Sequence, residues 1–90
     1  MRKRYRTFSG SYRQRIYTVL FEYQKGMCAI CKRSERVTQK GKLVRLSMDH
    51  NHETNDIRGL LCRACNTGIG QFNEDPKALR NAAKYLETFN

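Results

Sequence analysis

The sequence predicts a small α+β domain that is stabilised by zinc and flanked by an N-terminal and a C-terminal helix. Three observations support this fold class: two Cys-x-x-Cys pairs, two short apolar segments between them, and a helical pattern of apolar residues towards each end of the chain. A chain of 90 residues allows one domain. Its core is modest in size, so a bound metal ion is expected to add stability that burial alone does not supply.

The N-terminal part is predicted to be a basic arm followed by a helix. Residues 1 to 10 read as a flexible basic arm, and residues 11 to 90 as the single folded domain. Ser11, with Gln14 three residues later, fits a capping box, and Gly26 supplies a helix stop. The apolar residues between these signals recur at helical spacing and are expected to form core or a dimer seam; they are Tyr12, Ile16, Val19, Leu20 and Tyr23.

All four cysteines lie in Cys-x-x-Cys pairs, and they define the predicted metal site. The two-residue spacer lets both thiolates of a pair turn towards one ion, so two pairs complete a closed tetrahedral zinc site. The alternatives are two disulfides in a secreted domain or a redox motif. Against them, the sequence shows no apolar signal segment and neither pair follows a thioredoxin-like pattern. We therefore expect a reducing, cytoplasmic compartment and a structural zinc on Cys28, Cys31, Cys62 and Cys65.

The middle of the chain is predicted to hold a loop and a hairpin. Residues 32 to 42 are polar and basic, with neither a helical nor a strand period, and are expected to form a loop. Residues 43 to 48 and 57 to 61 favour two strands, which are joined by polar residues and are expected to pair as an antiparallel hairpin.

Two further helices are predicted after the hairpin. Residues 63 to 72 could form a short helix despite two glycines, because zinc would fix its first turn through two cysteines. Asp75 is expected to cap a terminal helix that has Pro76 at its first position. One face of this helix is apolar and consists of Leu79, Ala82, Ala83, Leu86 and Phe89.

The charge of the chain is unevenly distributed. The net charge is +10, with thirteen Lys/Arg against two Glu in residues 1 to 45 and five against six acidic residues in the remainder. A polyanion is the expected partner, although a solvated basic surface that aids solubility is the alternative. Aromatic residues interleaved with the N-terminal arginines, namely Tyr5, Phe8 and Tyr12, favour nucleic acid. No membrane partner is expected, because no stretch is apolar enough to span a bilayer.

A carboxylate, an imidazole and an amide stand close to the cysteine pairs. Asp49 and Asn66 offer oxygen ligands for Mg²⁺ or Mn²⁺, and His50 offers a base for attack on a phosphodiester. An unperturbed imidazole has a pKa of about 6.5, which suits a general base at neutral pH. The alternative is structural: Asp-His pairs often form turns, and an Asn after Cys-x-x-Cys often caps a knuckle. His52 could contact phosphate or support the metal shell.

Three segments of the sequence together resemble a known nuclease family. They are Cys28-Ala29-Ile30-Cys31, Met48-Asp49-His50-Asn51-His52-Glu53-Thr54, and Ile57-Arg58-Gly59-Leu60-Leu61-Cys62-Arg63-Ala64-Cys65-Asn66. This pattern is similar to the recombination endonuclease VII branch of the HNH, or His-Me finger, nucleases. The likeness runs from residue 27 to about residue 87, so residues 1 to 26 are interpreted from charge and periodicity alone.

The resemblance implies a ββα-metal core folded around a structural zinc. By position it assigns Asp49 and Asn66 to the catalytic divalent cation, His50 to the general base, and His52 to a second histidine of the motif. Asn51 stands where relatives often carry Asp. The long C-terminal extension of the junction-resolving member is missing from the sequence, so a preference for Holliday junctions does not carry over.

The functional hypothesis is a divalent-metal-dependent DNA endonuclease, phage-encoded and active in the host-cell cytoplasm, that hydrolyses phosphodiester bonds. A monomer would nick one strand, whereas a homodimer could cut both. The alternative, from a different class, is a non-catalytic zinc-stabilised module that binds nucleic acid. The sequence does not indicate which DNA structure or base sequence is preferred.

Overall fold

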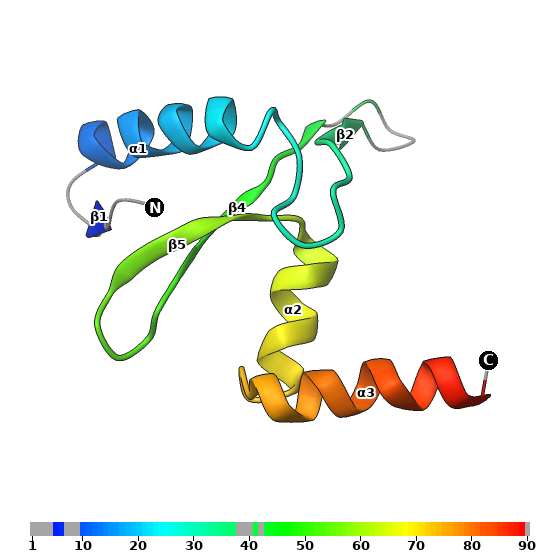
Figure 1. Cartoon of the computed structure of the whole chain (residues 1–90). Coiled ribbons are helices and arrows are strands. Elements are labelled where there is room, and N and C mark those ends of the chain that lie inside the picture. Colours follow the sequence, from blue (N-terminus) through cyan, green and yellow to red (C-terminus); the bar gives the residue numbers. More distant parts are fainter. Residues whose placement is uncertain (1–4, 7–9, 38–40, 42, 90) are drawn as a thin grey trace.

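The structure is a computed structural model that describes residues 5–6, 10–37, 41 and 43–89. Three helices and five short strands make up this part of the chain (Figure 1). In chain order they are β1 (Tyr5–Arg6), α1 (Gly10–Tyr23), β2 (Arg36–Val37), β3 (Leu43–Val44), β4 (Ser47–His50), β5 (Asp56–Leu61), α2 (Arg63–Gln71) and α3 (Pro76–Phe89). None of the helices in the described ranges has the length and apolar character needed to cross a bilayer.

The predicted antiparallel hairpin is present as β4 and β5, the two central strands of the molecule. β1 adds to the other edge of β5, giving a three-stranded sheet of order β1-β5-β4. The predicted strand over residues 43 to 48 is wrong in extent, because it divides into β3 and β4. Residues 32 to 42 are likewise not all loop, since β2 pairs antiparallel with β3 in a separate two-stranded ribbon.

The predicted N-terminal arm contributes a strand to the sheet. In β1, Tyr5 lies opposite Ile57 and Arg6 lies opposite Asp56. β5 therefore has a strand partner on its second edge at Asp56 and Ile57. Residues 1–4 and 7–9 of the predicted arm lie outside the described residues.

α1 begins and ends close to the predicted residues. It starts at Gly10, so Ser11 lies inside the first turn and the prediction that Ser11 caps the helix is wrong. The predicted stop is confirmed: Gly26 adopts φ +71°, and its backbone N–H donates to the Phe21 carbonyl at 2.8 Å. A Cβ at Gly26 would also approach the Phe21 ring to 3.0 Å, so a side chain there would be both strained and crowded.

One edge of α1 forms the core together with β5 and the first cysteine pair. The buried side chains of the core are Ile16, Leu20, Cys28, Leu46, Ile57, Leu60 and Leu61. The predicted apolar stripe is therefore only partly buried, because Val19 is 48% exposed and Tyr23 is 70% exposed. Half-buried Tyr17 and Phe21 pack against the core in their place. The packed edge of α1 is thus rotated away from the stripe that the sequence indicated.

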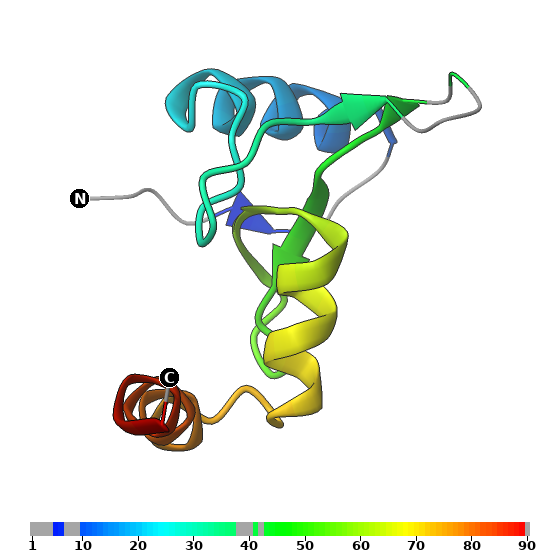
Figure 2. The same ribbon diagram turned by 90° about the vertical axis from the view of Figure 1, so that its right-hand side faces the viewer.

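α3 is capped as predicted but packs very little. The Asp75 Oδ1 atom accepts a hydrogen bond from the Lys77 backbone N–H at 3.0 Å, and Pro76 is the first helical residue. None of the α3 residues is buried. Figures 1 and 2 both place α3 beyond the far end of α2, on the side of the sheet opposite α1.

Candidate active site and metal centre

The four cysteines converge, as the sequence predicted. Their Sγ atoms all lie within 4.8 Å of one another, and the Sγ atoms of Cys31 and Cys62 are 3.6 Å apart. A tetrahedral zinc ion with Zn–S bonds of about 2.3 Å separates its sulfur ligands by roughly 3.8 Å. The cluster therefore fits one zinc ion closed by four thiolates.

The local backbone aims these thiols at one another. Cys62 is the N-cap of α2, and its Sγ atom accepts a hydrogen bond from the Cys65 backbone N–H at 3.4 Å. In the first pair, the Ile30 N–H donates to the Cys28 Sγ atom at 3.4 Å. Lys32, with φ +65°, turns the chain back after the first pair. The first pair thus forms a tight turn and the second begins α2, and a metal ion would join them.

The ionisation of the thiols shows why a cation belongs there. Burial raises the pKa of Cys28, but hydrogen bonds from Cys62, Cys31 and Ile30 outweigh this effect and bring the pKa to about 6. Burial first, and then its cysteine neighbours, raise the pKa of Cys65 to about 12. The thiols therefore differ in how readily they ionise, and a bound cation would stabilise all four as thiolates.

Asp49 is buried on β4 and is held by an arginine from the neighbouring strand. The side chain of Arg58 donates from Nε to Asp49 Oδ2 at 2.7 Å and from Nη2 to Asp49 Oδ1 at 3.0 Å. Asp49 is 8% exposed, so this bidentate pair supplies the charge compensation that a buried carboxylate requires. The carboxylate, with burial opposing, in turn raises the pKa of Arg58.

A β-bulge brings Arg58 to Asp49. In the hairpin register, Asp49 lies opposite Gly59 whereas His50 lies opposite Ile57, so Arg58 is the extra residue on β5. In a regular ladder, Arg58 and Gly59 would point to opposite faces of the sheet. The bulge re-aims Arg58 towards the face of Asp49.

Glu74 connects this pair to the second histidine. It lies in the turn between α2 and α3, where Asn73 and Glu74 both adopt positive φ, at 54° and 55°. One carboxylate oxygen of Glu74 accepts from Arg58 Nη2 at 3.0 Å, and the other lies 3.1 Å from His52 Nε2. We call Asp49, Arg58, Glu74 and His52 the charge network. It ties the hairpin to the C-terminal end of α2.

The predicted Asp-His-Asn-His run divides into different structural roles. His50 is the last residue of β4 and is half-buried, and its ring centroid lies 4.8 Å from that of His52. The Asn51 Oδ1 atom accepts from the backbone N–H groups of Glu53 and Thr54 at 2.8 and 3.1 Å. Asn51 therefore folds the turn that places the two histidines next to each other.

Asn66 lies on α2, immediately after the second cysteine pair. Its side chain is exposed, and its backbone N–H donates to the Cys62 carbonyl at 2.9 Å. α2 packs against both β4 and β5. The turn of α2 that bears Asn66 is therefore held both by the Cys62 cap and by the hairpin.

A groove lies between the hairpin turn and the end of α2. Its volume is about 620 Å³, and the residues that line it are Asn51, His52, Glu53, Arg58, Gly70, Asn73 and Glu74. Sequence reasoning did not assign a role to Arg58 or Glu74. A charged residue within the apolar strand was a signal for Arg58. Glu74 carried no signal, since its place depends on how the chain turns after α2.

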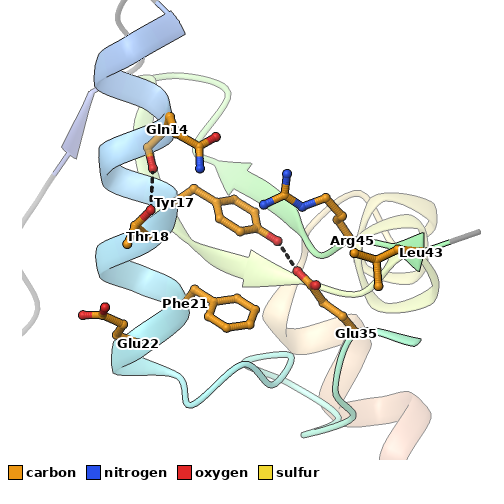
Figure 3. A pocket seen from close by; sticks show the side chains of 8 residues that line it. All are labelled: Gln14, Tyr17, Thr18, Phe21, Glu22, Glu35, Leu43 and Arg45. Carbon is orange, nitrogen blue, oxygen red and sulfur yellow. Dashed lines mark hydrogen bonds between the residues drawn. The ribbon is translucent and has the colours of Figure 1, made fainter. Parts of the chain in front are cut away.

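A second cavity, of about 290 Å³, lies on the other side of the molecule, between α1 and β3 (Figure 3). Tyr17 from α1 donates a hydrogen bond to Glu35 there, and the guanidinium of Arg45 lies 4.7 Å from the centre of the Tyr17 ring. Burial, followed by the Glu35 carboxylate, raises the pKa of Tyr17. Among the residues that the structure describes, none lines both cavities. These contacts anchor α1 to the segment that follows the first cysteine pair.

Comparison with known proteins identifies the family. The profile described as recombination endonuclease VII matches residues 2–88, nearly the whole chain. The chain belongs to the recombination endonuclease VII family. The family resemblance that the motifs indicated is thereby confirmed.

Two phage proteins and one crystal structure are similar to this member of the family. The Gene 59 proteins of Mycobacterium phages D29 and L5 are 42% and 39% identical over 71 residues, which cover 78% of this chain and 40% of each relative. The ββα-Me type II restriction endonuclease Hpy99I is 29% identical with a TM-score of 0.59, over 94% of this chain and 44% of that chain. The ββα-metal fold is confirmed. The chain spans less than half the length of these relatives.

Proposed function

We propose that this chain is a divalent-metal-dependent DNA endonuclease that hydrolyses phosphodiester bonds. The observation that carries the proposal is that β4, which ends in buried Asp49 and His50, packs against α2, the helix on which Asn66 follows Cys65. The family match over residues 2–88 supports a nuclease. The similarity to Hpy99I, a ββα-Me restriction endonuclease, supports the same class of enzyme.

His50 is assigned to the general base. Its imidazole would take the proton of the water that attacks the phosphorus atom in line with the leaving 3′ oxygen. The neighbouring His52 ring, 4.8 Å away, restricts the orientation of His50. His52 itself is held by Glu74 and borders the groove, where it can contact a phosphate oxygen.

Asp49 and Asn66 are assigned to the catalytic cation, because a carboxylate and an amide oxygen are the ligands that Mg²⁺ and Mn²⁺ accept alongside water and phosphate. When bound, the cation would stabilise the negative charge that develops on the phosphate and the leaving oxygen. The Asp49 carboxylate is already fixed in position by its arginine, and the backbone of Asn66 is fixed by its helix. The Asp49 ligand is therefore oriented in advance.

The surplus of basic residues supports DNA as the substrate. Thirteen Lys/Arg lie in residues 1 to 45, and Arg13, Arg15, Lys25 and Lys32 among the described residues are exposed. Such side chains bind phosphates and release counterions, so affinity for DNA should fall steeply as salt is added. One active centre per chain cuts one strand, and two chains would be needed to cut both.

The decisive experiment is cleavage of supercoiled plasmid by the zinc-loaded protein with Mg²⁺ or Mn²⁺. The wild-type protein should convert the supercoiled form to nicked or linear DNA, and the His50→Ala variant should not. Glu87→Gln, an exposed change on α3, is the matched control. Equal cleavage by wild type and His50→Ala would refute the assigned base.

A second candidate is a zinc-stabilised module that binds nucleic acid without cutting it. One observation favours it: both oxygens of the Asp49 carboxylate accept hydrogen bonds from Arg58, which is a cation already in place. This candidate predicts salt-dependent DNA binding and intact plasmid with every divalent ion tested.

A further inference from the structure

Asp49 meets a positive charge within its own fold at the place where the proposed function requires a metal ion. Arg58 uses Nε and Nη2 to bind the two oxygens of the Asp49 carboxylate, at 2.7 and 3.0 Å. The guanidinium and a divalent cation would carry like charges towards the same two atoms. They therefore oppose each other at Asp49.

Arg58 has a second acidic partner within reach of the same atom. Its Nη2 donates both to Asp49 Oδ1 and to Glu74 Oε1, each at 3.0 Å. A guanidinium carries five N–H donors in a rigid fork, so it can keep one carboxylate while it releases another. Because both carboxylates already contact Nη2, the move from a shared to a single partner requires only a small shift of the guanidinium.

Glu74 is built into the fold as an anchor. The backbone N–H of Glu74 donates to the Ile69 carbonyl at 2.8 Å, and its left-handed φ of 55° directs the chain sharply after α2. Its second oxygen is engaged by His52. Glu74 thus stays in place whether or not Arg58 binds Asp49, and it borders the open groove whereas Asp49 is buried.

We propose that Arg58 is an exchangeable counter-ion for Asp49: it holds the carboxylate in position until the divalent cation binds, and then transfers its hydrogen bonds to Glu74. This inference rests on the proposed function and adds two positioning residues, Arg58 and Glu74, to it. Arg58 keeps the buried Asp49 charged and oriented before the metal arrives. Glu74 lowers the free energy needed to release Arg58.

The exchange predicts effects of opposite sign for the two residues. Arg58→Gln removes the competing charge, so the affinity of the zinc-loaded protein for Mn²⁺ should rise, by about tenfold if the coupling is of ordinary size. Glu74→Gln removes the second anchor, so Arg58 should stay on Asp49 and the affinity should fall by about fivefold. If Arg58 and Glu74 only supported the site structurally, both substitutions would lower the affinity for Mn²⁺.

The measurement is titration of free Mn²⁺ by electron paramagnetic resonance, without DNA. Asp49→Asn should abolish Mn²⁺ binding at the proposed site. The Mn²⁺ binding that is lost in this variant is therefore the binding to compare among the others. Arg80→Gln and Glu87→Gln change the charge of the protein by the same amounts on exposed positions of α3 and should leave the affinity unchanged. Zinc content and thermal unfolding establish that each variant is folded.

A conservative variant, Arg58→Lys, should change the Mn²⁺ affinity in the same direction as Arg58→Gln. Arg58→Lys keeps the charge but loses the two-pronged contact, so its hold on Asp49 is weaker. The affinity for Mn²⁺ should rise by about two- to threefold, less than in Arg58→Gln. If Arg58→Gln loses its zinc, Arg58→Lys decides the question.

The outcomes separate the exchange from the nuclease proposal. Lower Mn²⁺ affinity in both the Arg58 and the Glu74 variants would overturn the exchange and leave the proposed metal site intact. A wild-type protein with no Mn²⁺ binding that depends on Asp49 would overturn both. Opposite signs in the two variants would support the exchange.

Discussion

The zinc cluster and the charge network both place acidic groups inside a small fold, but they neutralise them differently. The four thiols of the cluster lie close enough together to share one metal ion, which would stabilise them as thiolates. Asp49 is instead neutralised by a side chain of the same chain, Arg58. A closed site with a permanent ion suits folding. A carboxylate paired with an arginine of the same chain keeps its charge without an added ion.

Removal of zinc should have the largest effect. Zinc binding to small four-ligand sites contributes about 10 kcal/mol or more, whereas a domain of this size is stable by only about 5 to 15 kcal/mol. Cys28 is fully buried and belongs to the same core as Leu60. A strong chelator should therefore unfold the chain, as measured by circular dichroism. Retention of full helicity after zinc is stripped would show that the cysteine cluster does not need an ion for folding.

Replacement of the proposed base should have the next largest effect, and on activity alone. His50→Ala should lower the rate of plasmid cleavage by about 10² to 10⁴, the usual contribution of a general base. His50 is half-buried and lies outside the buried core, so zinc content and unfolding temperature should change little. A matching loss of zinc would show that the two centres are not independent.

A moderate effect on stability alone is expected at Gln24. Its side-chain amide donates to the carbonyls of Met27 and Leu60 at 2.8 and 2.9 Å, and its carbonyl accepts from the Leu60 N–H at 2.9 Å. Gln24→Ala would remove the partner of the Leu60 N–H and of the Met27 carbonyl next to fully buried Leu60, whereas the Leu60 carbonyl would keep its hydrogen bond from the Ala29 N–H at 3.0 Å. The cost should be about 3 kcal/mol in denaturant unfolding.

The control for Gln24 is Gln14→Ala, on the same helix. Gln14 is exposed, so its replacement should change the stability by no more than about 0.5 kcal/mol. Similar costs for the two variants would mean that the Gln24 contacts do not stabilise the scaffold of the zinc centre.

The smallest effect is expected on α3, which lies outside both centres. Leu86 is 62% exposed whereas Leu20 of α1 is 2% exposed, although both helices contain 14 residues. Leu86→Ala should change the free energy of unfolding by about 0.5 kcal/mol or less, and Leu20→Ala should cost about 2 to 5 kcal/mol. A cost above about 1 kcal/mol for Leu86→Ala would indicate that α3 packs against another surface.

Local sequence signals predicted the elements that depend on neighbouring residues. The Asp75-Pro76 start of α3 and the left-handed Gly26 after α1 are confirmed, because caps and stops are decided within one turn of chain. The hairpin was also predictable, since two β-favouring segments close in sequence pair readily. The predicted stripe on α1 was only partly right, because periodicity indicates an apolar face but not which edge of it meets a neighbour.

The sequence by itself determined which four cysteines converge, the hairpin, the helices and the family to which the chain belongs. The Cys-x-x-Cys spacing and the motif that surrounds His50 are short-range patterns that survive any later packing. Tertiary structure alone decided that Arg58 meets Asp49 and that Glu74 meets both Arg58 and His52. The physical reason is that a bulge in β5 and two left-handed residues after α2 set these contacts, and no local sequence pattern marks either position.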